Sequence, residues 1–273
     1  MKNSFVTLLA TDSFLPGVLV LNESLKKHNK KHDLLVLVSE IVADNVLQTL
    51  KEKQIKTRLI KEIYNPSSLG ADERSFRYTY TKVRIFELYE FDKVVYIDAD
   101  MLVCNNIESL FDVPHLSAVI AGGLYPGNDS WRDLNSGLMV IEPGQELFNR
   151  LLSAISQLPS GDGSDQGFLH SFFNDWPENT LMHLPHTYNV PFCYIDEYCS
   201  SHNFTFDYHR KKLDTNIAVI HYWGKHKPWD INRRSLKRNG IEKWEQSLLL
   251  WWDTYLTAKT DENIREAQIT DAV

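Results

Sequence analysis

The chain of 273 residues has the composition of a folded globular protein, with 43% hydrophobic and 24% charged residues. This balance excludes collagen-like, intrinsically disordered and disulfide-scaffold classes. The formal net charge is −7, so the molecule as a whole repels nucleic acid and acidic membranes, and an anionic ligand needs a local cationic site. A chain of this length can form one large α/β domain or two smaller ones, and one domain with additions is the preferred interpretation.

The cysteines and the amino terminus bear on the compartment. Cys104, Cys193 and Cys199 are odd in number and lack metal-type spacing, which fits a reducing compartment. Asp12 stands where a signal peptide would remain uncharged, and no stretch is long and apolar enough to span a bilayer. We therefore expect a cytoplasmic protein without a transmembrane segment.

Apolar runs alternate with amphipathic segments along the first hundred residues. Strands are predicted over 5–10, 34–39, 56–60 and 93–97, and helices over 15–29, 43–53 and 81–90. Such alternation predicts a parallel sheet with helices on both faces.

The pattern is looser after residue 100. Strands are predicted over 117–122, 137–141 and 217–222, and helices over 145–158, 165–173 and 241–258. The polar stretch 124–136 is typical of a binding loop. We expect one α/β domain over 1–229 and a carboxyl-terminal extension over 230–273, formed by a basic segment and an amphipathic helix that packs on the core.

Two aspartates follow a buried strand directly. Asp98 and Asp100 are separated by one residue, so both carboxylates point to the same side of an extended chain. Hard divalent cations prefer oxygen ligands, and ligands of open α/β sheets bind beyond the carboxyl ends of the strands. A metal site is one interpretation, and a helix cap or polar turn is the ordinary alternative.

A second polar segment follows the last predicted strand. His221 ends that strand, and Gly224 and Lys227 follow at intervals of three. Imidazole beside two carboxylates favours manganese over magnesium, Gly224 allows the main chain to approach a diphosphate, and Lys227 neutralises it. Taken alone, His221 would more often be a hydrogen-bonded core histidine, and Lys227 would more often be a solvated surface charge. Together with Asp98 and Asp100 they indicate a metal-diphosphate site.

At these motifs the sequence resembles the nucleotide-sugar glycosyltransferases of family 8, and within them the glycogenin-like branch. The matching segments, in chain order, are TLLATDSFLPGVLVL, TKVRIFELYEFDKVVYIDAD, Asn135-Ser136-Gly137, the run from Asp162 to Gly167, and HYWGKHKPW. Five ordered matches over most of the chain are far more specific than any one of them. The resemblance implies a GT-A type, Rossmann-like nucleotide-sugar-binding fold, with 1–229 as the catalytic domain. It also implies manganese-dependent, retaining transfer from a UDP-sugar, with Mg²⁺ as a possible substitute.

The resemblance also implies roles for individual residues. Asp98, Asp100 and His221 would bind the metal. The rest of the donor would meet the uridine-pocket residues Leu9, Thr11 and Phe14, the diphosphate-binding residues Lys82, Gly224 and Lys227, and Ala99 between the two aspartates. The residues that would face the donor sugar and the acceptor are Asn135, Ser136, Asp162, Asp165 and Gln166.

Three of these residues are candidates for the chemical step. Departure of UDP leaves positive character on the sugar ring, which a carboxylate or amide oxygen stabilises. Asp162, Asp165 and Gln166 are the catalytic candidates, with turn formation as their ordinary alternative. Phe14 replaces a tyrosine of the glycogenins, so stacking is kept and a hydroxyl contact is lost. Arg74 and Arg77 precede the Lys82 segment and are further donor candidates without a firm match.

The preferred activity is transfer of a hexose, glucose first, from a UDP-sugar to a separate glycan, lipid or protein acceptor. Self-glucosylation at Tyr194 or Tyr198 is the alternative, and a catalytically inactive UDP-sugar-binding scaffold is the alternative of another class. A phosphatase does not account for the His-Gly-Lys segment, and a dehydrogenase lacks Gly-X-Gly-X-X-Gly after the first strand. No nucleic acid partner is expected, and a homodimer is possible.

The carboxyl-terminal extension begins with a basic stretch. Residues 225–243 contain seven Lys or Arg, directly before a tryptophan-rich helix. Such a stretch can make peripheral contact with an anionic membrane. A helix that packs its aromatic face on the core, with a solvated positive side, is the preferred interpretation.

Overall fold

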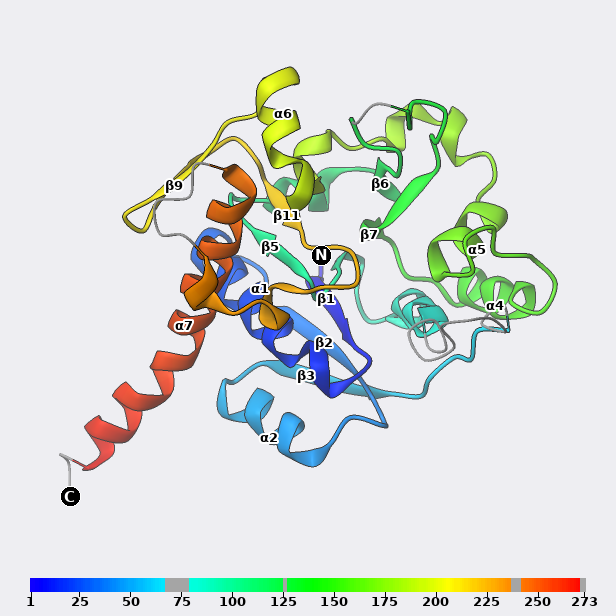
Figure 1. The fold of residues 1–273 in the computed structure, drawn as a ribbon. Coiled ribbons are helices and arrows are strands. Elements are labelled where there is room, and N and C mark those ends of the chain that lie inside the picture. Colours follow the sequence, from blue (N-terminus) through cyan, green and yellow to red (C-terminus); the bar gives the residue numbers. More distant parts are fainter. Residues whose placement is uncertain (67–78, 125–126, 237–241, 271–273) are drawn as a thin grey trace.

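The computed structural model describes residues 1–66, 79–124, 127–236 and 242–270, and side chains of the last helix as far as residue 260. A six-stranded sheet lies at the centre, in the order β3-β2-β1-β4-β7-β6 (Figure 1). Its strands are β1 (Asn3–Leu9), β2 (Leu34–Ser39), β3 (Lys56–Ile60), β4 (Lys93–Ile97), β6 (Ser117–Ile120) and β7 (Leu134–Ile141).

The prediction of parallel strands is correct for only part of the sheet. Strands β3, β2, β1 and β4 are parallel, whereas β7 is antiparallel to β4 and β6 is antiparallel to β7. The described residues between β6 and β7 form turns rather than a helix, and a connection without a crossover helix favours antiparallel neighbours. The sheet is therefore mixed.

Helices cover both faces of this sheet. One face packs against α1 (Leu15–His28) and α2 (Asp44–Glu52), and the other against α4 (Gln145–Ala154), α5 (Asp165–Phe172) and the 3-10 helix η2 (Thr79–Glu87). Alternate residues of β1 divide between the faces, because Phe5 and Leu9 join the α1 side and Val6 joins the η2 side. Two apolar layers thus surround the strands.

The helix predicted over 81–90 is a 3-10 helix and lies slightly earlier. Side chains three residues apart align in a 3-10 helix, and Tyr80, Val83 and Phe86 are all buried on the sheet. The aligned row of large side chains fills this face of the sheet. It also directs Lys82 to the carboxyl end of β4.

A second, smaller sheet lies beside the first. It has the order β5-β11-β8, formed by β5 (Met101–Val103), β11 (Val219–His221) and β8 (Val190–Pro191). Strand β5 begins directly after Asp100, and His221 is paired with Met101 in the register of β5 and β11. This pairing brings the two halves of the chain together at the end of β4.

The remaining 3-10 helices of the described residues are short. They are Asp12–Phe14, Glu108–Asp112, Trp176–Glu178, Thr180–Met182, His186–Tyr188, Phe192–Tyr194, Pro228–Asp230 and Arg233–Ser235.

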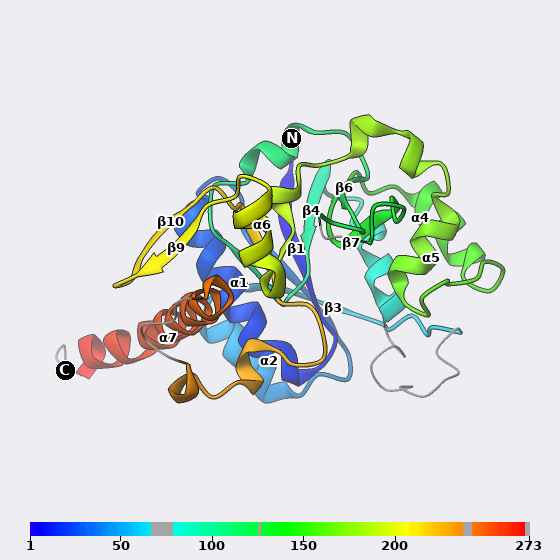
Figure 2. The same cartoon turned by 45° about the horizontal axis from the view of Figure 1, so that its top comes forward.

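The carboxyl-terminal helix α7 (Lys243–Thr270) packs on α1 and on the α6 helix (Ile195–Ser201). Trp251 is fully buried and contacts Trp229, with ring centroids 5.7 Å apart, whereas Trp244 and Leu256 are exposed. Figures 1 and 2 show the last turns of α7 extending beyond the rest of the molecule.

The division of the chain into a catalytic domain and an extension at residue 229 stays a prediction. No helix within the described ranges has the length and hydropathy needed to cross a membrane.

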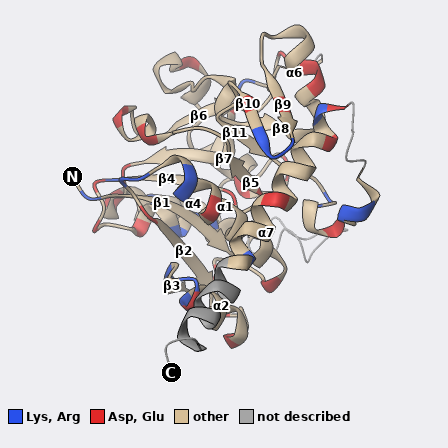
Figure 3. Cartoon of the chain, turned by 90° about the vertical axis from the view of Figure 1, so that its left-hand side faces the viewer, with Lys and Arg blue, Asp and Glu red and all other residues tan. Residues whose placement is uncertain are grey.

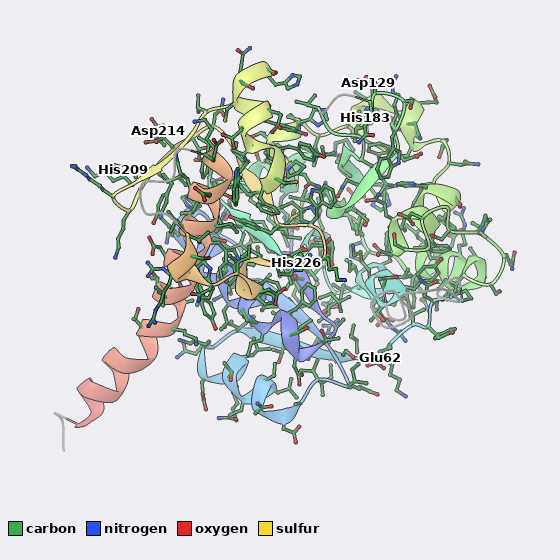
Figure 4. The ribbon with its side chains drawn as sticks, viewed as in Figure 1. Glu62, Asp129, His183, His209, Asp214 and His226 are labelled. Carbon is green, nitrogen blue, oxygen red and sulfur yellow. The ribbon has the colours of Figure 1, made fainter. Side chains whose placement is uncertain are left out.

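A hairpin absent from the sequence prediction lies beside α7. Strands β9 (Phe206–His209) and β10 (Lys212–Thr215) are joined by Arg210 and Lys211, which have φ values of 50° and 64°. Glycine and asparagine are the usual residues at such positions, so the sequence carries no turn signal here. Figure 3 shows the turn as a basic segment of the surface, and Figure 4 shows the labelled His209 and Asp214 on this outlying hairpin.

Candidate active site

The two aspartates lie in a tight turn between β4 and β5. The Asp98 N–H donates to the Gly137 carbonyl at 2.8 Å, and the Met101 N–H donates to the Asp98 carbonyl at 3.1 Å. The turn, together with the β5–β11 pairing, places Asp98, Asp100 and His221 so that one potential ligand atom from each lies within 4.8 Å of the others. In the part of the chain that the structure describes, this is the His/Cys/Asp/Glu cluster suited to a metal ion.

A chain of side-chain hydrogen bonds orients His221. Asn135 Oδ1 accepts from the Gly137 N–H at 2.9 Å and from Asn189 Nδ2 at 2.7 Å. This leaves Asn189 Oδ1 as the acceptor for His221 Nδ1 at 3.0 Å, which directs Nε2 towards Asp100 Oδ1 at 3.3 Å. An imidazole with its proton on Nδ1 has a free lone pair on Nε2, as a metal ligand requires. The donor set of two carboxylates and this nitrogen fits Mn²⁺.

Burial and charge act oppositely on the two carboxyl groups. Burial raises the pKa of Asp98, and the Lys82 charge opposes this only in part. Burial also raises the pKa of Asp100, but His221 and Lys227 outweigh it and hold that pKa well below its ordinary value. Asp100 is therefore an anion that lies beside His221 and the Lys227 ammonium.

Lys82 connects the metal cluster to α5. Its Nζ lies 3.1 Å from Asp98 Oδ1 and 2.8 Å from Asp165 Oδ2, and it donates to the Ser136 carbonyl at 3.3 Å. Burial lowers the pKa of Lys82, but Asp165 and Asp98 outweigh it and raise the pKa above its ordinary value. The ammonium thus links β4, β7 and α5 at one buried point.

The residues predicted to face the sugar do not all lie together. Asp165 Oδ2 also accepts from Ser136 Oγ at 2.9 Å, and Gln166 Oε1 accepts from the Ser136 N–H at 3.1 Å, so both adjoin the Lys82 network. Asp162 has another environment, because its Oδ1 accepts from the Ser164 N–H at 2.8 Å and the Gly167 N–H at 3.0 Å. That oxygen organises the turn before α5, and a catalytic role for Asp162 stays a prediction.

Lys227 connects the metal cluster to the predicted uridine pocket. Its Nζ lies 2.5 Å from Asp100 Oδ2 and 5.7 Å from the centroid of the Phe14 ring. Phe14 in turn contacts Trp229, with centroids 5.4 Å apart. Gly224 has a φ of 106°, a conformation that favours glycine and lets this loop turn back over the site. Figure 4 shows His226, on the same loop, near the centre of the molecule.

Other predicted pocket residues contribute differently. The Leu9 side chain is buried in the core, so only its backbone is available to a ligand. Thr11 Oγ1 lies 2.9 Å from Ser13 Oγ at the start of the first 3-10 turn. Ala99 is buried, and its carbonyl lies so close to Gly17 that a Cβ there would be 2.2 Å away. Arg74 and Arg77 lie outside the described residues.

Sequence reasoning gave no role to three supporting residues, although two of them, Tyr96 and Gly137, stand inside the matching segments. Tyr96 donates its O–H to Asp98 Oδ1 at 2.5 Å, and its position two residues before Asp98 on the same strand could have indicated this. Gly137 is required because a Cβ there would lie 2.8 Å from His221 Cε1. Asn189, which orients His221, lies in a segment without periodicity and had no sequence signal.

The fold places this cluster beyond the carboxyl end of β4, where open α/β sheets bind their ligands, and comparison with known proteins gives the family. The family model described as Glycosyl transferase family 8 matches residues 5–233. The chain belongs to glycosyl transferase family 8, it has the GT-A fold, and it is a glycosyltransferase.

Individual relatives are similar over much of the chain. Glycogenin-1 of Oryctolagus cuniculus is 33% identical over 267 residues, covering 93% of this chain and 76% of glycogenin-1. Inositol phosphorylceramide glucuronosyltransferase 1 of Arabidopsis thaliana is 34% identical over 248 residues, covering 84% of this chain and 43% of that protein. The apo form of the glycosyltransferase GlyE of Streptococcus pneumoniae has a TM-score of 0.60 at 20% identity, covering 94% of this chain and 60% of GlyE. The chain thus spans less than two thirds of the plant enzyme and of GlyE.

Proposed function

We propose that this protein is a retaining, Mn²⁺-dependent glycosyltransferase that moves glucose from UDP-glucose to a separate glycan, lipid or protein acceptor. The observation that carries the proposal is the cluster of Asp98, Asp100 and His221 at the carboxyl end of β4, flanked by Lys82 and Lys227. Ligands of open α/β sheets bind at this edge. Similarity to glycogenin-1 supports glucose as the sugar.

The metal would be held by two carboxylates and the Nε2 of His221. When bound, Mn²⁺ supplies positive charge that stabilises a diphosphate leaving group. Mg²⁺ is a weaker substitute in this proposal because imidazole suits transition ions better. The hydrogen bond between His221 and Asn189 keeps the ring oriented for this role.

Charged and polar side chains of the chain would stabilise the leaving diphosphate and the sugar ring separately. Lys227 lies on the Phe14 side of the cluster, where it can neutralise a diphosphate whose nucleoside lies against Phe14. Asp165 and Gln166 lie beside Ser136, where their oxygens can stabilise positive character on the sugar ring. Lys82 holds Asp165 in place. Positive and negative groups thus face the two charges that bond cleavage separates.

A donor panel tests this function. With Mn²⁺ present, we expect turnover of UDP-glucose to exceed that of UDP-galactose, UDP-N-acetylglucosamine and UDP-glucuronate, because a site that pairs one hydroxyl discriminates strongly against its epimer. A chelator should abolish the reaction. The measurement is UDP release over time. Better use of another donor would replace glucose in the proposal, and no release from any donor would favour the inactive scaffold.

A separate acceptor is proposed over self-glucosylation. Tyr198 is fully buried, and its hydroxyl oxygen accepts from the Leu124 N–H at 2.9 Å, so this residue is not accessible as an acceptor in the folded protein. Tyr194 is partly buried at the start of α6. After incubation with UDP-glucose and Mn²⁺ we expect unchanged intact mass by mass spectrometry, alongside UDP release. A ladder of hexose additions that disappears in Tyr194→Phe would contradict this expectation.

The location of the protein and its further partners are also proposals. We propose a cytoplasmic location and no nucleic acid partner, in line with the net charge of −7. In the basic stretch 225–243, Arg233 pairs with Asp253 at 2.6 Å and Lys243 donates to the Phe206 carbonyl at 2.6 Å. These contacts support a structural role for part of the stretch over peripheral membrane contact. Homodimer formation stays a prediction.

A further inference from the structure

Both oxygens of the Asp100 carboxylate lie close to a nitrogen atom of another side chain. His221 Nε2 lies 3.3 Å from Oδ1, and Lys227 Nζ lies 2.5 Å from Oδ2. The Asp100 side chain is only 8% exposed, so water screens these interactions weakly. A divalent cation bound to Asp100 would therefore lie beside the ammonium of Lys227, and the two positive charges would repel each other.

The two lysines of the site are held very differently. Lys82 is surrounded by Asp98, Asp165 and two oxygen atoms of Ser136. Lys227 has two partners for its Nζ, Asp100 and the Tyr222 carbonyl at 3.3 Å. If a ligand took the place of Lys227 at Asp100, the Lys227 ammonium would keep only the Tyr222 carbonyl of these two partners and could turn towards another anion. Lys82 would keep its partners and stay in place.

The backbone of Lys227 is fixed independently of its side chain. Its N–H donates to Asp230 Oδ2 at 3.0 Å, and its carbonyl accepts from the Asp230 N–H at 2.9 Å. The flexible four-carbon side chain can therefore change its direction while the loop keeps its conformation. Phe14 lies near the ammonium, so a nucleoside diphosphate bound on that side would offer a second anionic partner.

We propose that Lys227 is a charge switch that couples nucleotide binding to metal binding. Without nucleotide, its ammonium neutralises Asp100 and opposes the metal; with nucleotide, it pairs with the diphosphate and no longer does so. This inference rests on the proposed function, because it takes the metal and the nucleoside diphosphate as the ligands of this site. The switch keeps the empty site charge-balanced and makes the metal bind together with the donor.

The test is Mn²⁺ affinity measured by calorimetry with and without UDP, in the unmodified protein and in Lys227→Met. Without UDP, Lys227→Met should bind Mn²⁺ at least about fivefold more tightly, because the competing ammonium is gone. With saturating UDP, the same variant should bind Mn²⁺ about as tightly as the unmodified protein, because Lys227 then no longer opposes the metal. The gain in Mn²⁺ affinity from the substitution should therefore disappear when UDP is added.

Lys225→Met is the matched control, since Lys225 is exposed on the same loop and carries the same charge. It should leave both affinities within about twofold. Lys227→Gln, which is more hydrophilic, should show the same gain in Mn²⁺ affinity without UDP and its disappearance with UDP, and circular dichroism should show that all variants are folded. Unchanged or weaker Mn²⁺ binding by both Lys227 variants without UDP would overturn the switch. Failure of the unmodified protein to bind UDP would instead contradict the proposed donor.

Discussion

Asp100→Asn should reduce UDP release from UDP-glucose at least about a hundredfold while the protein stays folded. The substitution keeps the size of the side chain but removes the negative charge that faces both His221 and Lys227. A neutral amide is a weaker ligand for a hard cation than a carboxylate. The measurements are the initial rate at saturating Mn²⁺ and the circular dichroism spectrum.

The control for this variant is Asp207→Asn. Asp207 is an exposed aspartate of the outlying hairpin, so the same chemical change there should leave the rate unchanged. The Mn²⁺ concentration for half-maximal rate should rise for Asp100→Asn only. Full activity of Asp100→Asn, or of the unmodified protein in a chelator, would show that Asp100 is not a metal ligand needed for the reaction.

The position of Asp100 was predictable because local sequence determines it. Strands β2, β3 and β4 have the predicted bounds. β2 and β4 are short apolar runs ended by polar residues, whereas β3 was predicted from the alternation along 56–60. Residues that follow a buried strand lie at the edge of the sheet, and this places Asp98 and Asp100 without knowledge of the other strands. The same local reasoning places His221 at the end of β11.

Contacts between distant segments were not predictable. Asn189 bonds to Asn135 and His221, which lie far from it in the chain, and no periodicity surrounds it. The pairing of β11 with β5 has the same character, because strand β5 is three residues long and follows the aspartates without a turn signal of its own. The supporting layer of the site is thus set by tertiary packing, whereas the ligands themselves follow local patterns.

For Asp162, the contacts agree with turn formation, the alternative to a catalytic role that the sequence left open. Asp162, Asp165 and Gln166 had the same standing in the sequence, but only the last two adjoin Ser136 and the Lys82 network. Asp162 Oδ1 accepts hydrogen bonds from its own turn, including one from Ser160 Oγ at 3.0 Å. Asp, Ser and Gly commonly stabilise turns in this way, so a sequence motif alone does not separate the two roles.

Lys82→Met should destabilise the protein by about 3–5 kcal/mol, because it leaves buried carboxylates without their cation. The Lys82 and Asp165 side chains are each 9% exposed, and the Asp98 side chain is 24% exposed. Methionine fills a similar volume, so the lost charge dominates over lost packing. The measurement is the free energy of unfolding from urea denaturation in the absence of metal and nucleotide.

Two further variants make this result specific to the buried pair. Lys82→Met combined with Asp165→Asn should be more stable than Lys82→Met alone, because the second change removes one uncompensated charge. Lys56→Met is the control, since Lys56 pairs with Asp33 at 2.7 Å at an exposed position where both side chains are more than half accessible, and such pairs contribute little. If Lys82→Met were no less stable than Lys56→Met, Lys82 would not be needed to balance Asp98 and Asp165. Recovery in the double variant would instead show that charge balance at this point, shared by β4, β7 and α5, maintains the floor of the site.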